Sequence, residues 1–128
     1  MTVPFWCVLV GCVLPYLLAG TSGYYKTKQL GSLDNHYPRA QSARLTGAGA
    51  RVVAAQENAW EAIAVFAPAV VVNHLAGGDA GTASALALGW VGARLLHAVF
   101  YVSDLDKLRS LAFLVALVCA VGLFVTAA

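Results

Sequence analysis

The chain has 128 residues, a length that suits one domain. Hydrophobic residues make up 60% of it and charged residues only 11%, whereas a soluble domain carries about 25% charged residues. So few charges cannot cover a surface that faces water, and we predict a protein embedded in a lipid bilayer. The formal charge of +2 and the absence of a basic stripe with interleaved aromatic residues argue against a nucleic-acid partner.

Four apolar stretches are long enough to cross a membrane. A helix needs roughly 20 apolar residues to span a hydrocarbon core of about 30 Å. Open strands would leave unpaired backbone groups in lipid, so helices are the expected structure. The sequence therefore predicts an all-α fold, an integral membrane four-helix bundle in one domain over residues 1–128. We expect its helices at about residues 3–23, 47–74, 82–102 and 108–126.

Basic residues separate the predicted loops into two kinds. The loop after the first span and the loop before the fourth contain lysine and arginine, whereas the loop NHLAGGDAGT and both chain ends contain none. Cytoplasmic loops are the basic ones. With an even number of spans, both termini are then predicted on the non-cytoplasmic side. The basic residues on the predicted cytoplasmic side are Lys26, Lys28, Arg39, Arg44, Arg51, Lys107 and Arg109.

The three cysteines, Cys7, Cys12 and Cys119, all lie inside apolar stretches. Their number is odd and their spacing fits no metal motif. We interpret them as small buried residues rather than as a disulfide or a reactive thiol. No metal site is predicted.

The second predicted span carries polar residues that a membrane helix normally lacks. In RVVAAQENAWEAIAVF, Asn58 and Glu61 are three positions apart and share a helix face, and Arg51 lies two turns earlier on roughly the same side. Glu57 also lies near Glu61. Ionisable residues inside a span usually face the bundle interior and mark a functional site.

The third span contributes a matching polar stripe. Arg94, His97 and Tyr101 follow one another at helical spacing in WVGARLLHAVFY. Glu61 lies at about the same membrane level as Arg94, which makes the two candidates for an ion pair.

Two interpretations of these polar residues stay open. They either join the helices through hydrogen bonds or line a cavity open to the cytoplasm, together with Arg109 and Ser110 at the start of the fourth span. Such a cavity suits a small zwitterionic or anionic ligand.

Between the first two spans, LDNHYPRAQ contains the turn-forming residues Asp34, Asn35 and Pro38.

Three segments resemble one known family. AAQENAWEAIAVF is similar to the asparagine–x–x–glutamate signature of the MAPEG superfamily (membrane-associated proteins in eicosanoid and glutathione metabolism). GARLLHAVFY and LRSLAF resemble its third- and fourth-helix signatures, and LDNHYPRAQ resembles its bacterial branch. The resemblance covers essentially the whole chain.

The resemblance implies a homotrimer in the bacterial inner membrane, with glutathione as co-substrate bound between neighbouring subunits. By motif position, Arg51, Asn58, Glu61, Arg94, His97 and Tyr101 would bind glutathione. Arg109 would stabilise the glutathione thiolate, with Ser110 beside the sulfur. A cation lowers a thiol's pKa, and the thiolate is the nucleophile. The implied activity is a transferase or peroxidase that acts on lipophilic small-molecule electrophiles.

Two departures from the family pattern support a second hypothesis. Ala54 stands where family enzymes often have arginine, and Glu57 stands where a basic residue is common. Both changes remove positive charge, for which Arg51 is a partial substitute. The alternative is a catalytically inactive binding or structural membrane protein of the same fold. A small multidrug exporter is a weaker third hypothesis, because the first span has no acidic residue.

Overall fold

A computed structural model describes residues 1–127 and contains five helices within them. Residue 128, the last of the predicted domain, lies outside the described residues. The fold is entirely helical over this range, as predicted. The helices are α1 (Val3–Leu30), α2 (Pro38–Ser42), α3 (Gly47–Leu75), α4 (Ala80–Val102) and α5 (Asp106–Val125).

Helix α1 continues well beyond the first predicted span. Hydropathy predicted an end near Gly23, but the helix runs to Leu30 and stops only at Gly31, whose φ of 87° is left-handed. Gly31 donates its backbone N–H to the carbonyl of Thr27 at 3.0 Å. Glycine adopts this conformation without a steric penalty, and such a residue is a common helix terminator. The apolar run is therefore shorter than the helix, because the backbone hydrogen bonding continues past the last apolar residues.

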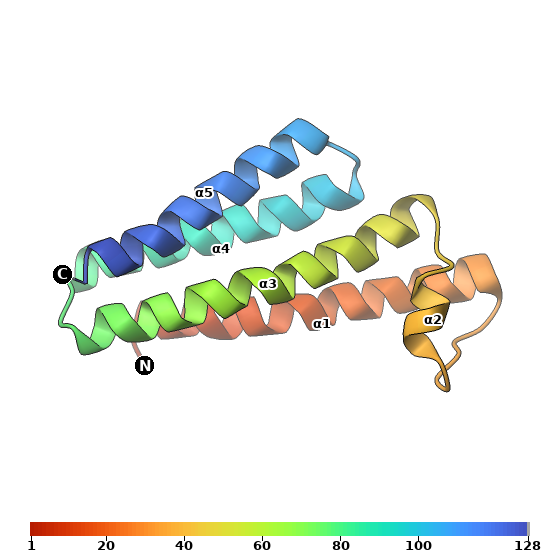
Figure 1. Ribbon diagram of the computed structural model, residues 1–128, viewed down its shortest axis with the longest axis horizontal. Helices are drawn as coiled ribbons and strands as arrows, with labels where there is room; N and C mark the ends of the chain where they lie inside the picture. Colours follow the sequence, from red (N-terminus) through yellow and green to blue (C-terminus); the bar gives the residue numbers. More distant parts are fainter. Residues whose placement is uncertain (128) are drawn as a thin grey trace.

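The four long helices form two antiparallel pairs. Helix α1 packs along α3, and α4 packs along α5, while α3 also contacts both helices of the second pair (Figure 1). Both termini lie at the same end of the molecule, and the short α2 and the α4–α5 turn lie at the other. The pair α4–α5 diverges from α3 toward that second end. This arrangement leaves room for side chains between the pairs.

Small residues and one aromatic stack allow the helices to approach closely. The rings of Phe66 on α3 and Trp90 on α4 stack with centroids 3.8 Å apart. Helix α5 turns a row of alanines inward, at Ala112, Ala116 and Ala120. Small residues at such positions are typical of membrane helix contacts, because they let the backbones come near each other.

The prediction that all three cysteines are buried holds for Cys7 alone. Cys7 is buried in the core, Cys12 and Cys119 are half-buried, and all three thiols are free.

Three helices among the described residues, α1, α4 and α5, are long and apolar enough to cross a membrane. Helix α3 is longer than any of them but is not in this set. Its Arg51, Glu57 and Glu61 are charged, and further polar residues lower its hydropathy at both ends. Three of the four predicted spans thus have the length and apolar composition that a membrane crossing requires. That α3 also crosses the membrane remains a prediction.

Candidate functional site

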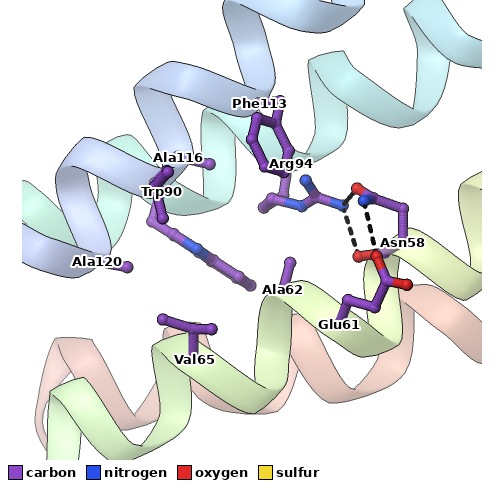
Figure 2. A pocket seen from close by; sticks show the side chains of 10 residues that line it. Asn58, Glu61, Ala62, Val65, Trp90, Arg94, Phe113, Ala116 and Ala120 are labelled. Carbon is purple, nitrogen blue, oxygen red and sulfur yellow. Dashed lines mark hydrogen bonds between the residues drawn. The ribbon is translucent and has the colours of Figure 1, made fainter.

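Asn58 of α3 is the centre of a polar network between the two helix pairs. Arg94 of α4 donates from Nη2 to the side-chain oxygen of Asn58 at 2.8 Å and to its backbone carbonyl at 3.2 Å. The Asn58 amide nitrogen in turn donates to Oε2 of Glu61 at 3.1 Å (Figure 2). Because its amide group both accepts and donates, Asn58 connects the cation to the carboxylate.

This network differs from the ion pair that the sequence suggested. Within residues 1–127 the one ion pair joins Arg51 to Asp104, and Glu61 does not reach Arg94 directly. Helical spacing indicated that Glu61 and Arg94 lie at the same level, which is correct. It could not indicate that Asn58, one turn earlier on the same face, would lie between them.

Two nitrogen atoms near this network are buried without a hydrogen-bond partner among the described residues. They are Nε of Arg94 and Nδ1 of His97. Only 2% of the Arg94 surface and 3% of the His97 surface is exposed. A buried polar atom that lacks a partner costs about 1–3 kcal/mol, and in native proteins it usually has a specific reason. A bound polar ligand would remove this cost.

A cavity of about 370 Å³, which we call the polar cavity, opens beside His97. Helices α3, α4 and α5 all contribute to it. The guanidinium of Arg109 lies 4.3 Å from the centre of the Tyr101 ring, which is a cation–π contact. The lining residues are Asn58, His97, Tyr101, Arg109, Ser110, Phe113 and Leu114.

Ser110 lines the polar cavity from the first turn of α5. Its hydroxyl donates to the carbonyl of Asp106 at 3.0 Å, one turn earlier in the same helix. The hydroxyl proton is therefore engaged, while the oxygen retains a lone pair that faces no partner in the described chain. Serine hydroxyls rotate readily between partners, so Ser110 can accept or donate to a ligand in the cavity.

A second cavity of about 190 Å³, the apolar cavity, adjoins the first. The two share Asn58 and Phe113. Figure 2 shows Arg94, Asn58 and Glu61 at one end of it and Val65, Trp90 and Ala120 farther away. The site as a whole is thus polar at one end and apolar at the other. The lining residues are Asn58, Glu61, Ala62, Val65, Trp90, Arg94, Phe113, Ala116, Leu117 and Ala120.

Arg51 is the one predicted site residue that lines neither cavity. Its Nε donates to the carbonyl of Val102 at 3.1 Å, and its Nη1 lies 3.5 Å from Oδ2 of Asp104. The long side chain thus reaches the end of α4 instead of following the helix face toward Asn58. The other seven predicted residues, from α3, α4 and α5, surround the two cavities.

Sequence reasoning missed the apolar members of the site. Trp90, Phe113 and Leu117 line the cavities, but an apolar residue in an apolar helix gives no signal in the sequence. Only the packing of the helices decides which of them faces a cavity.

Three helices are apolar and long enough to span a membrane, and polar side chains line a ligand-sized cavity between the helices. These features are those of an integral membrane helical protein. The sequence matches the model of the MAPEG family over residues 3–128, and the chain belongs to this family. Family members include glutathione-dependent transferases and peroxidases, and they commonly use glutathione. Comparison with curated proteins and with solved structures gives no match.

Proposed function

We propose that this protein is a glutathione-dependent membrane transferase or peroxidase that acts on lipophilic electrophiles. The observation that supports this most directly is the polar cavity, in which Arg109, His97 and Tyr101 surround one space beside the Asn58–Glu61 pair. Membership of the MAPEG family supports the same function.

The chemistry of the cavity suits glutathione. Glutathione carries carboxylates and amide carbonyls, which accept hydrogen bonds, and one ammonium group, which donates them. His97 in the polar cavity and Arg94 in the adjoining apolar cavity each have a buried nitrogen without a partner. Glu61, at the polar end of the apolar cavity, offers a carboxylate. The cavity of about 370 Å³ falls in the usual range of ligand pockets, roughly 300–1,000 Å³.

In the proposed reaction Arg109 stabilises the glutathione thiolate by its positive charge. A cation beside a thiol lowers its pKa and raises the fraction of thiolate at neutral pH. The thiolate sulfur attacks the electrophilic carbon and forms a carbon–sulfur bond, while the leaving group departs with the electron pair of the bond that breaks. The hydroxyl of Ser110 donates a hydrogen bond to the sulfur. The adjoining apolar cavity receives the lipophilic part of the electrophile.

We further propose that the active unit is a homotrimer of four-helix transmembrane bundles in a bacterial inner membrane. Helix α3 would then also cross the membrane, as the second of the four spans, with its polar residues turned toward the other helices and away from lipid. The network of Asn58, Glu61 and Arg94 supports this, because it satisfies polar groups inside the fold. A neighbouring subunit would close the open side of the polar cavity.

Substitution of Arg109 tests the proposed activity. The purified protein should conjugate glutathione to chlorodinitrobenzene, and Arg109→Ala should lower kcat/KM at neutral pH by roughly 10²-fold, as expected for the loss of one preorganised charge. Its pH–rate profile should also move to higher pH, because the thiol loses the nearby cation. Lys107→Ala removes an exposed cation of the same helix and is the matched control. Wild-type protein that turns over neither electrophiles nor lipid hydroperoxides would contradict an enzymatic function.

The second candidate is an inactive binding or structural protein of the same fold. Ala54 and the exposed Glu57 support it, because they replace cations that family enzymes often use. Calorimetric titration with glutathione separates the two. Binding without turnover would favour the binding protein, and absence of binding would favour a structural role.

A further inference from the structure

The segment between α1 and α3 is held in a defined conformation by its own hydrogen bonds. Gln41 of α2 is buried, accepts the backbone N–H of Asp34 at 3.0 Å and donates to the carbonyl of Ser32 at 2.6 Å. Asp34 in turn accepts the backbone N–H groups of His36 and Tyr37 at 2.8 and 3.0 Å. The LDNHYPRAQ segment is therefore a structured loop, although the proposed reaction uses none of its residues.

This loop and the end of α1 line the largest cavity that we describe, an open hollow of about 610 Å³, which we call the loop cavity. It shares no residue with the polar or the apolar cavity. Its lining residues are Ala19, Gly20, Gly23, Tyr24, Lys26, Thr27, Leu33, Asp34, Asn35, Pro38 and Gln41.

Lys26 is a buried cation in the wall of the loop cavity. Only 9% of its surface is exposed. Its ammonium donates to the carbonyl of Pro38 at 3.0 Å, and within residues 1–127 it forms no ion pair. An ammonium has three N–H donors, and a buried charge is normally paired. An anionic group in the cavity would supply the missing partner.

The position of the loop cavity indicates where that anion comes from. Helix α1 has 28 residues, about 42 Å of helix, whereas the hydrocarbon core is about 30 Å thick. The apolar part of α1 ends near Gly23, so Lys26 lies at the level of the headgroups. Ala19 and Gly20 line the cavity on the apolar side, and the exposed Tyr24 is of the type that marks the membrane interface.

The charges lining the cavity are of both signs. Asp34 offers a carboxylate whose Oδ1 is engaged in the turn while Oδ2 has no partner in the described chain. We propose that the loop cavity binds the zwitterionic headgroup of a membrane phospholipid, with the phosphate on Lys26 and a primary ammonium on Asp34. A phosphoethanolamine headgroup fits this pair, because its ammonium can donate hydrogen bonds to the carboxylate.

Native mass spectrometry of the full-length protein tests this proposal with phosphatidylethanolamine, phosphatidylcholine and phosphatidylglycerol of equal chain length. The wild type should retain phosphatidylethanolamine best. Lys26→Met should weaken its binding roughly tenfold or more, since it removes a hydrogen bond to a charged group. Asp34→Asn preserves the turn and should reduce the preference for ethanolamine by up to about fivefold.

Two further variants control for charge and folding. Lys28→Gln removes an exposed cation that lies over Tyr24, outside the cavity lining, and should leave lipid retention unchanged. Lys26→Arg should restore most of the binding lost in Lys26→Met. Equal effects of the Lys26→Met and Lys28→Gln variants would overturn the proposal, because they would indicate a general surface charge. Equal retention of the three lipids would overturn it as well.

Soluble competitors distinguish the source of the headgroup. Inorganic phosphate and glycerophosphoethanolamine, which have no acyl chains, should displace the lipid only weakly. Efficient displacement by either would overturn the proposal in favour of a soluble phosphate ligand. Loss of glutathione binding in lipid-free Lys26→Met protein would overturn it too, because it would assign Lys26 to the reaction site. Failure of chlorodinitrobenzene turnover would leave the lipid result intact.

Discussion

Asn73 and Arg94 are both almost fully buried, but they differ in how their polar atoms are satisfied. The amide nitrogen of Asn73 donates to the carbonyl of Leu123 at 2.8 Å and to the hydroxyl of Thr126 at 3.1 Å. Nε of Arg94 has no partner in the described chain. Asn73 therefore stabilises the fold by itself, whereas Arg94 is only partly satisfied without a ligand.

Replacement of Asn73 by leucine should lower the stability of the fold. The variant loses both hydrogen bonds, and we expect the free energy of unfolding to fall by about 1–2 kcal/mol. Unfolding titrations in mixed micelles measure it. Thr126→Val keeps the buried bond from Asn73 to Leu123 and removes the bond to Thr126, together with the more exposed bond from the Thr126 hydroxyl to Gly122. It should have a smaller effect. An Asn73→Leu variant as stable as the wild type would show that this contact contributes nothing.

Asp79 caps the N-terminus of α4 and should make the stability depend on pH. Its carboxylate accepts the backbone N–H of Thr82 at 2.7 Å, and this hydrogen bond holds the pKa of Asp79 below its ordinary value of 3.8. A lowered pKa in the folded state means that the charged form stabilises the fold. This contribution is complete well above pH 3.8 and is lost as the pH falls through the lowered value.

The measurement compares the unfolding midpoints of wild type and Asp79→Ala at neutral pH and below pH 3.8. We expect the wild type to be more stable at neutral pH and the difference to shrink in acid. Asp79→Asn keeps the cap without the charge and should show little of this pH dependence. A difference between wild type and Asp79→Ala that is the same at both pH values would contradict the assignment.

From the sequence, the spacing of the candidate site residues predicted only which of them share a helix face. The spacing of Asn58 with Glu61 and of Arg94 with His97 indicated which residues share a helix face. It could not give the direction of a long side chain, and Arg51 reaches Val102 instead of the cavities. Family resemblance suggested roles for these residues, which the experiments above would test.

At the level of helices, Gly11 of α1 lies directly against side chains of two neighbouring helices. A Cβ atom at this position would lie 2.5 Å from Cδ1 of Ile63 on α3 and 2.9 Å from Cη2 of Trp90 on α4. Both distances are far below van der Waals contact. A larger residue at this position would therefore force the Ile63 side chain and the rigid Trp90 ring to move.

Gly11→Val should destabilise the protein by about 1–3 kcal/mol, the range found for overpacked cores. Gly92→Ala is the control, because a Cβ at Gly92 meets nothing within 4 Å. This variant should be as stable as the wild type or slightly more so, since alanine favours helix. Equal behaviour of the two variants in an unfolding titration would contradict the close packing around Gly11.

The sequence predicted the helices better than their ends. Long apolar runs indicated α1, α4 and α5 clearly, because hydropathy measures the apolar character that a helix needs in order to lie in lipid. The ends depend on local backbone conformation, as at Gly31, and hydropathy does not report it. The short α2 was not predicted, since five residues that are held by side-chain hydrogen bonds from Gln41 leave no periodic pattern.

For the whole molecule, the charge distribution predicts an orientation in the membrane. Both termini lie at one end (Figure 1), and the other end carries most of the basic residues, chiefly in the adjoining helix ends. The positive-inside rule places that basic end in the cytoplasm. A reporter enzyme that is active only outside the cytoplasm should therefore work when fused to either terminus. Activity of a strictly cytoplasmic reporter at either terminus would contradict this orientation.

Polar contacts join α3 to the α4–α5 pair at three levels along the molecule. The contact of Asn73 with Leu123 is buried, that of Asn58 with Arg94 is partly buried, and that of Arg51 with Asp104 is the most exposed. An exposed ion pair contributes little and is screened by salt, while a buried hydrogen bond is not.

Separation of the two helix pairs should therefore begin at the Arg51 end and proceed toward Asn73. The polar cavity lies on the side that opens first, so fluctuations of the fold would admit a ligand there without disturbing the packing around Asn73. From the graded strength of these contacts we expect the Arg51 end of the helices to open faster than the Asn73 end.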